Sequence, residues 1–273
     1  MGITKRSDNL DSSRPISNGV KCPHAVIFDL DNTLAESFQS PQPHVASRLH
    51  QLLDLMPVAI MSGASFSRME EHLLPSLPED VHKGRLYLFP DTAAQCYLFH
   101  EGEWRSVYKN DFTKKEFDKI INVFTDALAE TRIIEGAPRW GELFLARDVQ
   151  VTFAALGIDA SPTEKAAWDP DRTKREQLKR FLEPRLPGFD IRISGRTAID
   201  ITRTGIDKAH GVRWFAERLK VEPHDMLFVG DDLEAGGNDA VVIPTGIQTI
   251  QVAGPHQTAD VIDSILAACA VTK

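Results

Sequence analysis

The stretch Ala25-Val-Ile-Phe-Asp-Leu-Asp-Asn-Thr-Leu34 decides the fold of this chain. Its uninterrupted apolar part, Ala25–Phe28, is typical of the central strand of a parallel sheet, which is buried on both faces. Asp29 and Asp31 follow at once and mark the carboxyl end of that strand, where open α/β sheets bind their ligands. Residues i and i+2 of an extended chain point the same way, so both carboxylates can face one point. Two converging anions repel each other unless a cation lies between them, and Mg²⁺ is the first candidate.

This pair of carboxylates predicts chemistry on phosphorus. We expect Asp29 to attack a phosphoryl group and form an aspartyl-phosphate. Asp31 would protonate the leaving oxygen and later deprotonate water. Thr33 would help to fix the loop. The alternative is an ordinary strand-to-loop exit, because Asp-rich turns are common at such places.

A second polar segment, Ile60-Met-Ser62-Gly63, also ends an apolar strand. The Ser62 hydroxyl, together with backbone N–H groups at the start of the next helix, can hold phosphate oxygens. A serine that simply caps the helix would give the same pattern.

A third segment, Gly205-Ile-Asp207-Lys208, opens a helix with a lysine. A cation in the first turn opposes the helix dipole, so its presence suggests an anion nearby. We expect Lys208 to neutralise the attacked phosphate and to hold Asp29. A solvated lysine next to a capping Asp207 is the alternative.

The fourth segment runs from Phe228 to Asp239, where an apolar strand leads into a glycine-rich acidic loop. Asp231 is the best candidate for a further oxygen ligand of Mg²⁺, with Asn238 and Asp239 as ligands or as partners of the ligands. An acidic turn without metal is the alternative. Together with Asp29 and Asp31, these residues complete the predicted metal site.

Composition limits the classes of protein that fit. The chain has 273 residues and a formal net charge of −8, which argues against a nucleic-acid or anionic membrane surface. No stretch is apolar enough to span a membrane, and the N-terminal residues lack the apolar region of a signal peptide. Three scattered cysteines (Cys22, Cys96 and Cys269) fit neither a disulfide framework nor a zinc site. We therefore expect a protein of the reducing cytoplasm.

The order of the expected elements predicts a Rossmann-like, doubly wound parallel sheet core with an inserted α+β cap. We expect a disordered tail over residues 1–22, a core formed by residues 23–92 and 194–273, and a cap over residues 93–193. Strands followed by helices indicate the core, whereas hairpins and two helices indicate the cap. The strands expected in the core are Ala25–Phe28, Val58–Met61, Leu86–Phe89, Ala198–Ile201, Met226–Val229 and Thr249–Val252.

With its aspartate pair, Ser62, Lys208 and Gly230-Asp231 in this order, the chain resembles the haloacid dehalogenase-like phosphotransferases. The insertion resembles the α+β cap of subfamily IIB, and the segments around Lys208 and Asp239 resemble eukaryotic-type phosphomannomutases. The resemblance implies Mg²⁺, an aspartyl-phosphate on Asp29, and a cap that closes over a phosphosugar.

The chain departs from the phosphomannomutase pattern at several arginines that such enzymes use to bind a bisphosphate. Arg147 matches one of the cap arginines, and Asp200 is retained, so both are expected to bind substrate. Other expected positions differ: the place of one arginine is near Phe38, and Trp140 and Ile158 stand where two others are expected. Arg139 lies one step from Trp140, and Ala198 replaces a serine.

These departures favour a Mg²⁺-dependent phosphatase that hydrolyses a small phosphorylated sugar or related metabolite. A phosphomannomutase-type mutase that uses a bisphosphate is the alternative, and a phosphosugar-binding module without activity is the third hypothesis. A phosphatase needs only water in place of the sugar hydroxyl, whereas each lost charge-assisted bond costs a mutase roughly 1.5–3 kcal/mol. We expect no nucleic-acid or membrane partner. A homodimer through the cap, for example through a hairpin over Ala94–Val107, is possible from the pattern.

Overall fold

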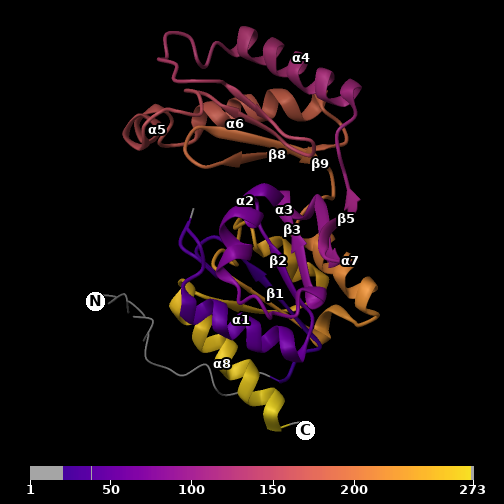
Figure 1. Ribbon diagram of the computed structural model, residues 1–273. Helices are drawn as coiled ribbons and strands as arrows, with labels where there is room; N and C mark the ends of the chain where they lie inside the picture. Colours follow the sequence, from indigo (N-terminus) through magenta and orange to yellow (C-terminus); the bar gives the residue numbers. More distant parts are fainter. Residues whose placement is uncertain (1–20, 38, 272–273) are drawn as a thin grey trace, which may run out of the picture.

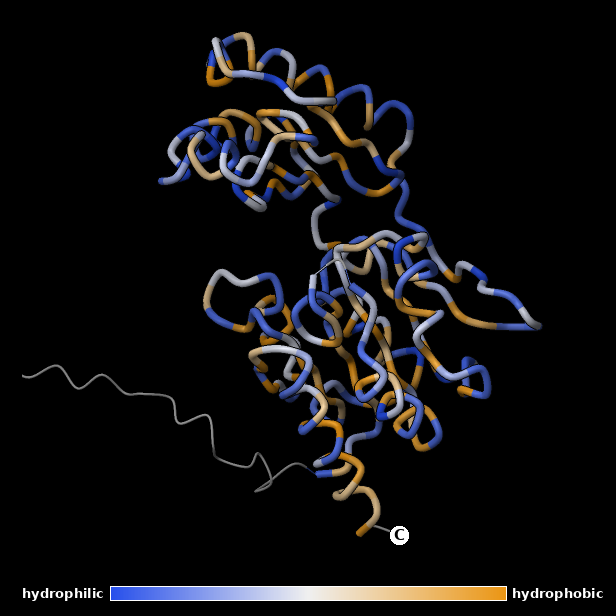
Figure 2. Tube along the Cα trace, turned by 60° about the vertical axis from the view of Figure 1, so that its left-hand side comes forward, coloured by the Kyte–Doolittle hydropathy of each residue, from blue (hydrophilic) through white to orange (hydrophobic). Residues whose placement is uncertain are grey.

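The structure, a computed structural model, describes residues 21–37 and 39–271. Most of the tail expected over residues 1–22, and also Phe38, lie outside the described residues. Figure 1 shows two layered units, one above the other, and Figure 2 shows that hydrophobic segments are gathered inside each of them. Two connecting segments join the units (Figure 2). The sheet and helix order matches the predicted doubly wound core with a cap.

The lower unit is built on a seven-stranded sheet with the order β11-β10-β1-β2-β3-β4-β5. Neighbouring strands from β11 to β3 are parallel, and β4 and β5 are added antiparallel at one edge. The strands are β1 (Ala25–Asp29), β2 (Val58–Met61), β3 (Leu86–Phe89), β4 (Gln95–His100), β5 (Glu103–Lys109), β10 (Met226–Gly230) and β11 (Gln248–Gln251).

Hydrophobic side chains cover both faces of this sheet, as the apolar strands predict. One cluster packs the sheet against α1 (Pro43–Leu55) and α8 (Pro255–Val271), with Leu49 and Ile262 among its members. The other cluster packs the opposite face against α7 (Lys208–Leu219), through residues such as Phe215. Because β1 is buried along its whole length, the polar groups at its carboxyl end are held on a rigid element.

The helical segment that follows β2 is divided into short pieces in the structure. These are α2 (Phe66–Arg68), the π-helix η1 (Met69–Leu73) and the 3₁₀-helix η2 (Leu74–Ser76). Pro75 lies in η2 and has no N–H to donate, so a regular helix cannot continue through it. The other short elements of the core are α3 (Pro90–Ala93), η3 (Lys83–Arg85), η5 (Pro223–Asp225) and η6 (Ala240–Thr245).

The upper unit, which we call the cap, has a four-stranded antiparallel sheet with the order β6-β7-β9-β8. Its helices α4 and α6 share one cluster of buried side chains with this sheet. Thr113 and Ser161 each begin a helix with a reciprocal capping box, which satisfies the first free N–H groups. The elements are α4 (Lys114–Thr131), β6 (Phe144–Ala146), β7 (Val151–Ala154), α5 (Pro162–Trp168), α6 (Thr173–Leu182), η4 (Glu183–Arg185), β8 (Phe189–Ser194) and β9 (Ala198–Arg203).

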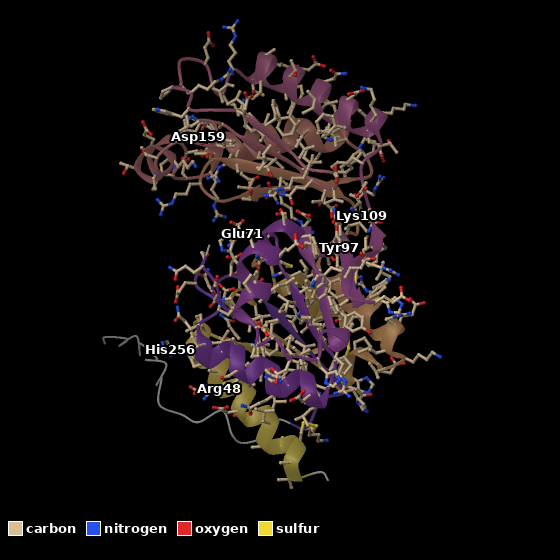
Figure 3. All side chains as sticks on the ribbon, in the orientation of Figure 1. Arg48, Glu71, Tyr97, Lys109, Asp159 and His256 are labelled. Carbon is tan, nitrogen blue, oxygen red and sulfur yellow. A yellow bond between two sulfur atoms is a disulfide. The ribbon has the colours of Figure 1, made fainter. Side chains whose placement is uncertain are left out.

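The predicted domain boundaries were wrong at both ends of the cap. The hairpin β4–β5 pairs with β3 and extends the core sheet, so residues 95–109 do not belong to the cap. Tyr97 and Lys109 mark this edge of the core in Figure 3, with the Lys109 Nζ atom 5.7 Å from the centre of the Tyr97 ring. Strand β9 pairs with β7 and β8, so residues 198–203 belong to the cap sheet. Alternating hairpin strands give the same local pattern in either sheet, and only the tertiary pairing decides between them.

The displaced hairpin also changes the expectation for a dimer. A contact through a cap hairpin over Ala94–Val107 cannot form as predicted, because that hairpin is an edge of the core sheet. A dimer through another part of the cap stays a prediction.

The expectation that the cysteines form no disulfide was also wrong. Cys22 and Cys269 are bonded, with a Cα–Cα distance of 4.7 Å and a sequence separation of 247 residues. They meet because α8 packs beside α1, close to the segment that leads into β1 (Figure 1). Such a distant pairing has no local signal in the sequence. Cys96 is a buried free thiol. Among the described residues, no helix is both long and apolar enough to cross a membrane.

Candidate active site

The site lies at the carboxyl end of the parallel strands and is centred on a buried lysine. Lys208, at the start of α7, is 1% exposed. Its Nζ atom donates to Asp29 Oδ1 and to Asp239 Oδ1, each at 2.5 Å. Asp29 ends β1, and Asp239 follows the loop after β10. Asp207 caps the helix by accepting from the His210 N–H at 3.0 Å. The helix thus has a capping Asp207, and Lys208 contacts carboxylates as well.

Three carboxylates form a group that can hold a metal ion. One oxygen from each of Asp29, Asp231 and Asp239 lies within 4.8 Å of the others. Thr33 donates to Asp231 Oδ1 at 3.4 Å and so links the β1 loop to the β10 loop. Oxygen donors of this kind suit a hard divalent cation such as Mg²⁺, which would offset the negative charge that Lys208 alone does not neutralise. The residues present therefore fit the predicted metal.

Gly230 explains why the fourth segment has a glycine before its aspartate. A Cβ atom at this position would lie 2.3 Å from Asp239 Oδ2, well inside contact distance. The same Oδ2 atom accepts the Asp232 N–H at 3.2 Å. The glycine thus allows the loop to fold back until the fully buried Asp239 reaches Lys208.

Burial and charge shape the pKa values of this cluster. Burial raises the pKa of Asp29 to about 6, although the neighbouring Lys208 acts in the opposite direction. Burial also raises the pKa of Asp231, with a further contribution from Asp239. For Lys208, burial alone would lower the pKa, but the two carboxylates more than compensate and raise it, so the ammonium stays charged.

Asp31 lies beside this cluster but outside the group of three. Its Oδ2 atom accepts from the Ser62 hydroxyl at 3.5 Å, and its Oδ1 atom accepts from Arg68 at 2.7 Å. A role for Asp31 as a metal ligand stays a prediction. Ser62 is 1% exposed, and its hydroxyl also accepts the Ala64 N–H at 3.0 Å, as a loop-fixing serine would.

A cap residue reaches the core next to Ser62. Arg147, in the β6–β7 turn, donates to Asp91 Oδ1 at 3.1 Å and to the Gly63 carbonyl at 3.3 Å. Asp91 is 4% exposed, and burial raises its pKa while Arg147 opposes this rise. Its neighbours Thr92 and Ala93, like Asp91 itself, have φ between 48° and 64°. Three successive non-glycine residues in this region are unusual and mark a constrained turn.

The other predicted residues have partners outside the group of three carboxylates. Asp200 belongs to the cap sheet, where its Oδ1 atom accepts from the Thr152 hydroxyl at 2.6 Å. Asn238 donates its backbone N–H to Asp232 Oδ2 at 2.8 Å, and a ligand role for its side chain stays a prediction. On the cap, Arg192 pairs with Asp207 at 3.4 Å, so it also connects the cap to the core near Lys208.

Sequence reasoning missed Arg68 and Asp91. Asp91 follows the apolar strand β3, and the strand-end signal that identified Asp29 could have found it. Arg68 has no comparable signal, since it stands in a polar segment of an irregular helix.

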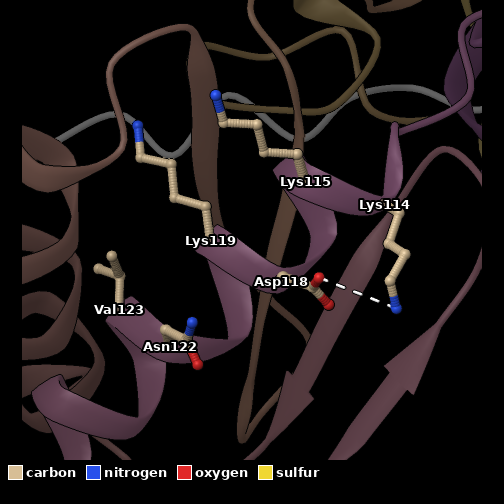
Figure 4. Close-up of a pocket in the computed structure, with 6 residues that line it drawn as sticks. All are labelled: Lys114, Lys115, Asp118, Lys119, Asn122 and Val123. Atoms are coloured by element: carbon tan, nitrogen blue, oxygen red, sulfur yellow. Dashed lines mark ion pairs between the residues drawn. The ribbon is translucent and has the colours of Figure 1, made fainter.

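A hollow on the cap surface is separate from this site. It has a volume of about 630 Å³ and is lined by one side of α4, including Lys114, Lys115 and Lys119 (Figure 4). Asp118 forms an ion pair with Lys114 at 4.0 Å. The hollow contains none of the carboxylates described above, so it is not the catalytic centre.

A doubly wound sheet with a cap, and a lysine that joins carboxylates at its strand ends, define a protein of the haloacid dehalogenase-like superfamily of phosphoryl-transfer enzymes. The sequence model of the eukaryotic phosphomannomutase family matches residues 45–268. The chain belongs to this family. The matched residues begin after Asp29 and Asp31. The place of these two residues in the site therefore rests on their contacts in the structure.

Individual relatives are distant. The chain is 22% identical over 219 residues to phosphomannomutase 1 of Homo sapiens, covering 78% of this chain and 80% of that protein. It is 24% identical over 219 residues to a phosphomannomutase of Galdieria sulphuraria, covering 78% and 82%.

Similar solved structures extend the comparison to other enzymes of the fold. An N-terminally truncated IMP-nucleotidase of Plasmodium falciparum has a TM-score of 0.65 at 18% identity, over 89% of this chain and 70% of that chain. The C-terminal domain of trehalose-6-phosphate phosphatase from C. albicans has a TM-score of 0.59 at 14% identity, over 90% and 93%. These similarities concern the fold.

Proposed function

We propose that this protein is a Mg²⁺-dependent phosphatase that hydrolyses a small phosphorylated sugar or related metabolite. The observation that carries the proposal is the contact of Lys208 with both Asp29 and Asp239, with Asp231 close by. A nucleophile, a cation and a set of oxygen ligands are thereby held together at one point. The same contact argues against a binding module without activity, because no part of the catalytic set is missing.

The residues have distinct tasks in this mechanism. Asp29 attacks phosphorus, so that an Oδ–P bond forms while the bond from phosphorus to the leaving oxygen breaks. Asp31 gives its proton to the leaving oxygen and then takes a proton from the water that attacks the aspartyl-phosphate. Lys208 offsets negative charge on Asp29 and on the phosphoryl group. Mg²⁺, held by Asp29, Asp231 and Asp239, would add positive charge next to the phosphoryl oxygens.

The positions of the arginines favour phosphatase over mutase activity. A mutase binds a bisphosphate at both ends and therefore needs cations in the cap. Arg139 lies in a hollow beside α4, with Leu128 and Arg132, and α4 lies on the side of the cap farther from the core (Figure 1). Arg147 pairs with Asp91 and would have to exchange this partner for a phosphate. Membership of the phosphomannomutase family is the observation that favours the mutase, so mutase activity is the second candidate.

One experiment separates the two activities. The purified protein with Mg²⁺ is supplied with a hexose 1-phosphate, with and without a hexose bisphosphate, and both inorganic phosphate and hexose 6-phosphate are measured. A phosphatase releases phosphate whether or not the bisphosphate is present. Formation of hexose 6-phosphate that depends on the bisphosphate would instead establish the mutase. If a broad panel of phosphorylated metabolites yields neither product, the binding module becomes the better hypothesis.

A cytoplasmic location is part of the proposal, and the bond between Cys22 and Cys269 is the observation that weighs against it. Disulfides persist mainly in oxidising compartments. Thiol labelling of the protein in freshly lysed cells tests this point, because reduced Cys22 and Cys269 would react and a bonded pair would not.

A further inference from the structure

Arg68 is the cation nearest to the predicted acid–base residue among the ion pairs of the described chain. Its two terminal nitrogens face the two oxygens of Asp31, at 2.7 Å for Nη2–Oδ1 and 3.5 Å for Nη1–Oδ2. The backbone of Arg68 is fixed because its N–H donates to the Ser65 side chain at 3.4 Å. Helix α2, which carries Arg68, lies at the top of the core, on the side that faces the cap (Figure 1). The guanidinium therefore lies beside Asp31, and its helix lies on the side of the core that faces the cap.

The groups that surround Asp31 are those that usually bind a phosphate. A guanidinium fork and a hydroxyl, that of Ser62, converge on one carboxylate. Arginine forks match phosphate and carboxylate oxygens equally well in geometry. Asp31 therefore occupies donors that a phosphoryl group, arriving next to Asp29, could also use.

In this arrangement Asp31 is directed at Arg68 and Ser62 rather than at a substrate atom. Both of its oxygens are engaged, Oδ1 by Arg68 and Oδ2 by Arg68 and Ser62. Opening the pair would free the carboxyl to turn towards a substrate atom. A phosphate dianion carries more negative charge than a carboxylate and should bind the guanidinium more strongly. Its arrival would therefore favour opening of the Arg68–Asp31 pair.

We propose that Arg68 is a phosphate-binding residue that exchanges Asp31 for the phosphoryl oxygens of the substrate. This inference rests on the proposed phosphoryl-transfer function and adds to it a residue from outside the recognised segments. In the free protein, Arg68 holds Asp31 in place. In the complex, Arg68 binds the phosphoryl group and leaves Asp31 available for proton transfer.

The affinity for inorganic phosphate, measured by calorimetry in the presence of Mg²⁺, tests the exchange without requiring turnover. Arg68→Gln removes the charge and should weaken phosphate binding by about 10- to 100-fold, as expected for the loss of charge-assisted bonds. Arg68→Lys keeps the charge but loses the fork, so its affinity should fall between those of the wild type and Arg68→Gln.

The chain offers a matched control in Arg48. It forms a two-pronged pair with Asp263 at 2.7 and 2.8 Å, and its side chain is 28% exposed compared with 23% for Arg68. Arg48 lies low on the core, away from the cap (Figure 3). Arg48→Gln removes a similar ion pair and should leave phosphate affinity and turnover unchanged.

The Asp31→Asn variant shows whether Arg68 binds phosphate itself or only positions Asp31. Asp31→Asn alone should bind phosphate more tightly than the wild type, because the competing anion is gone. Adding Arg68→Gln to this variant should again weaken binding by about 10- to 100-fold. If Arg68 only positions Asp31, the second substitution will have no effect there, and the proposal is wrong.

The outcomes also separate this inference from the proposed function. If the wild type releases phosphate from substrates but Arg68→Gln binds phosphate as well as Arg48→Gln does, only the inference fails. If the wild type releases no phosphate from any substrate while Arg68→Gln still weakens phosphate binding, the hydrolytic function fails and the binding role stands. If the wild type binds no phosphate at all, the inference is overturned.

Discussion

The charged groups at the strand ends of the core are more deeply buried than the arginines by which the cap reaches them. In the core, Lys208 and Asp239 are buried and contact each other at the carboxyl end of the sheet. In the cap, the arginines that reach the core, Arg147 and Arg192, have side chains 33% and 36% exposed. Fixed, dry charges suit the chemical step, whereas exposed charges on a separate unit can release one partner and bind another. Under the proposed function, the buried charges of the core would serve the reaction, and the exposed arginines of the cap would contribute to binding the substrate.

Removal of the proposed nucleophile should have the largest effect on the rate of phosphate release. If it does not, the chemical step does not depend on the buried charges of the core. Asp29→Asn should abolish phosphate release, because a neutral amide does not attack phosphorus. No phosphoryl adduct should appear by mass spectrometry of the intact protein. Lys208 keeps its contact with Asp239 in this variant, so thermal unfolding serves as the control for folding. Persistent turnover would exclude the covalent route.

The second effect concerns Asp31. Asp31→Asn should lower the rate by about 10²–10⁴-fold, the usual contribution of general acid–base catalysis. A substrate with a good leaving group should still form the phosphoenzyme, which would accumulate because its hydrolysis lacks a base. Rapid-quench measurement of the adduct checks this, and an adduct that neither forms nor accumulates would contradict the assigned role.

A cap residue should show a different kinetic pattern from the core residues. Arg147→Ala should raise KM by about 10- to 100-fold, as expected for a lost charge-assisted contact, and lower kcat less. Arg105→Ala, which removes a surface pair with Glu103 on β5, is the matched control and should change neither.

A larger fall in kcat than rise in KM would place Arg147 in the chemical step. Because Arg147→Ala leaves the buried Asp91 without this ion pair, the double variant with Asp91→Asn should be measured as well. It separates lost substrate binding from a destabilised turn.

The smallest effect is a pH dependence of metal binding in the core. Mg²⁺ and a proton compete for the Asp29 carboxylate, whose pKa is raised to about 6 by burial. Apparent Mg²⁺ affinity should therefore fall by about tenfold for each pH unit below this pKa and level off above it. Calorimetric titration across this range checks the slope. Asp29→Asn should weaken this dependence, because Asp231, whose pKa is also raised, still competes for a proton. A flat profile for the wild type would contradict the assignment.

The core was more predictable from the sequence than the cap. Ala25–Phe28 and the glycine before Asp231 carry strong local signals, because strand burial and close backbone approach restrict the residues that fit. The insertion of a cap was predictable from its helix and hairpin patterns. Its boundaries were not, since β5 and β9 join sheets that their own residues do not specify. Arg68 and the pair of Cys22 with Cys269 depend on contacts between distant segments, which no local pattern encodes.

The bond between Cys22 and Cys269 makes the core a covalent ring. The cap lies between Cys22 and Cys269 in the sequence, so it is part of this ring. Both segments that connect the cap to the core are therefore held in a closed loop of chain. Such a long cross-link lowers the entropy of the unfolded chain and typically stabilises a fold by about 2–4 kcal/mol. Reduction would remove this cross-link but leave α8 packed against α1 through the apolar cluster and the Arg48–Asp263 ion pair. The redox environment would therefore set the stability of the fold rather than the geometry around Lys208.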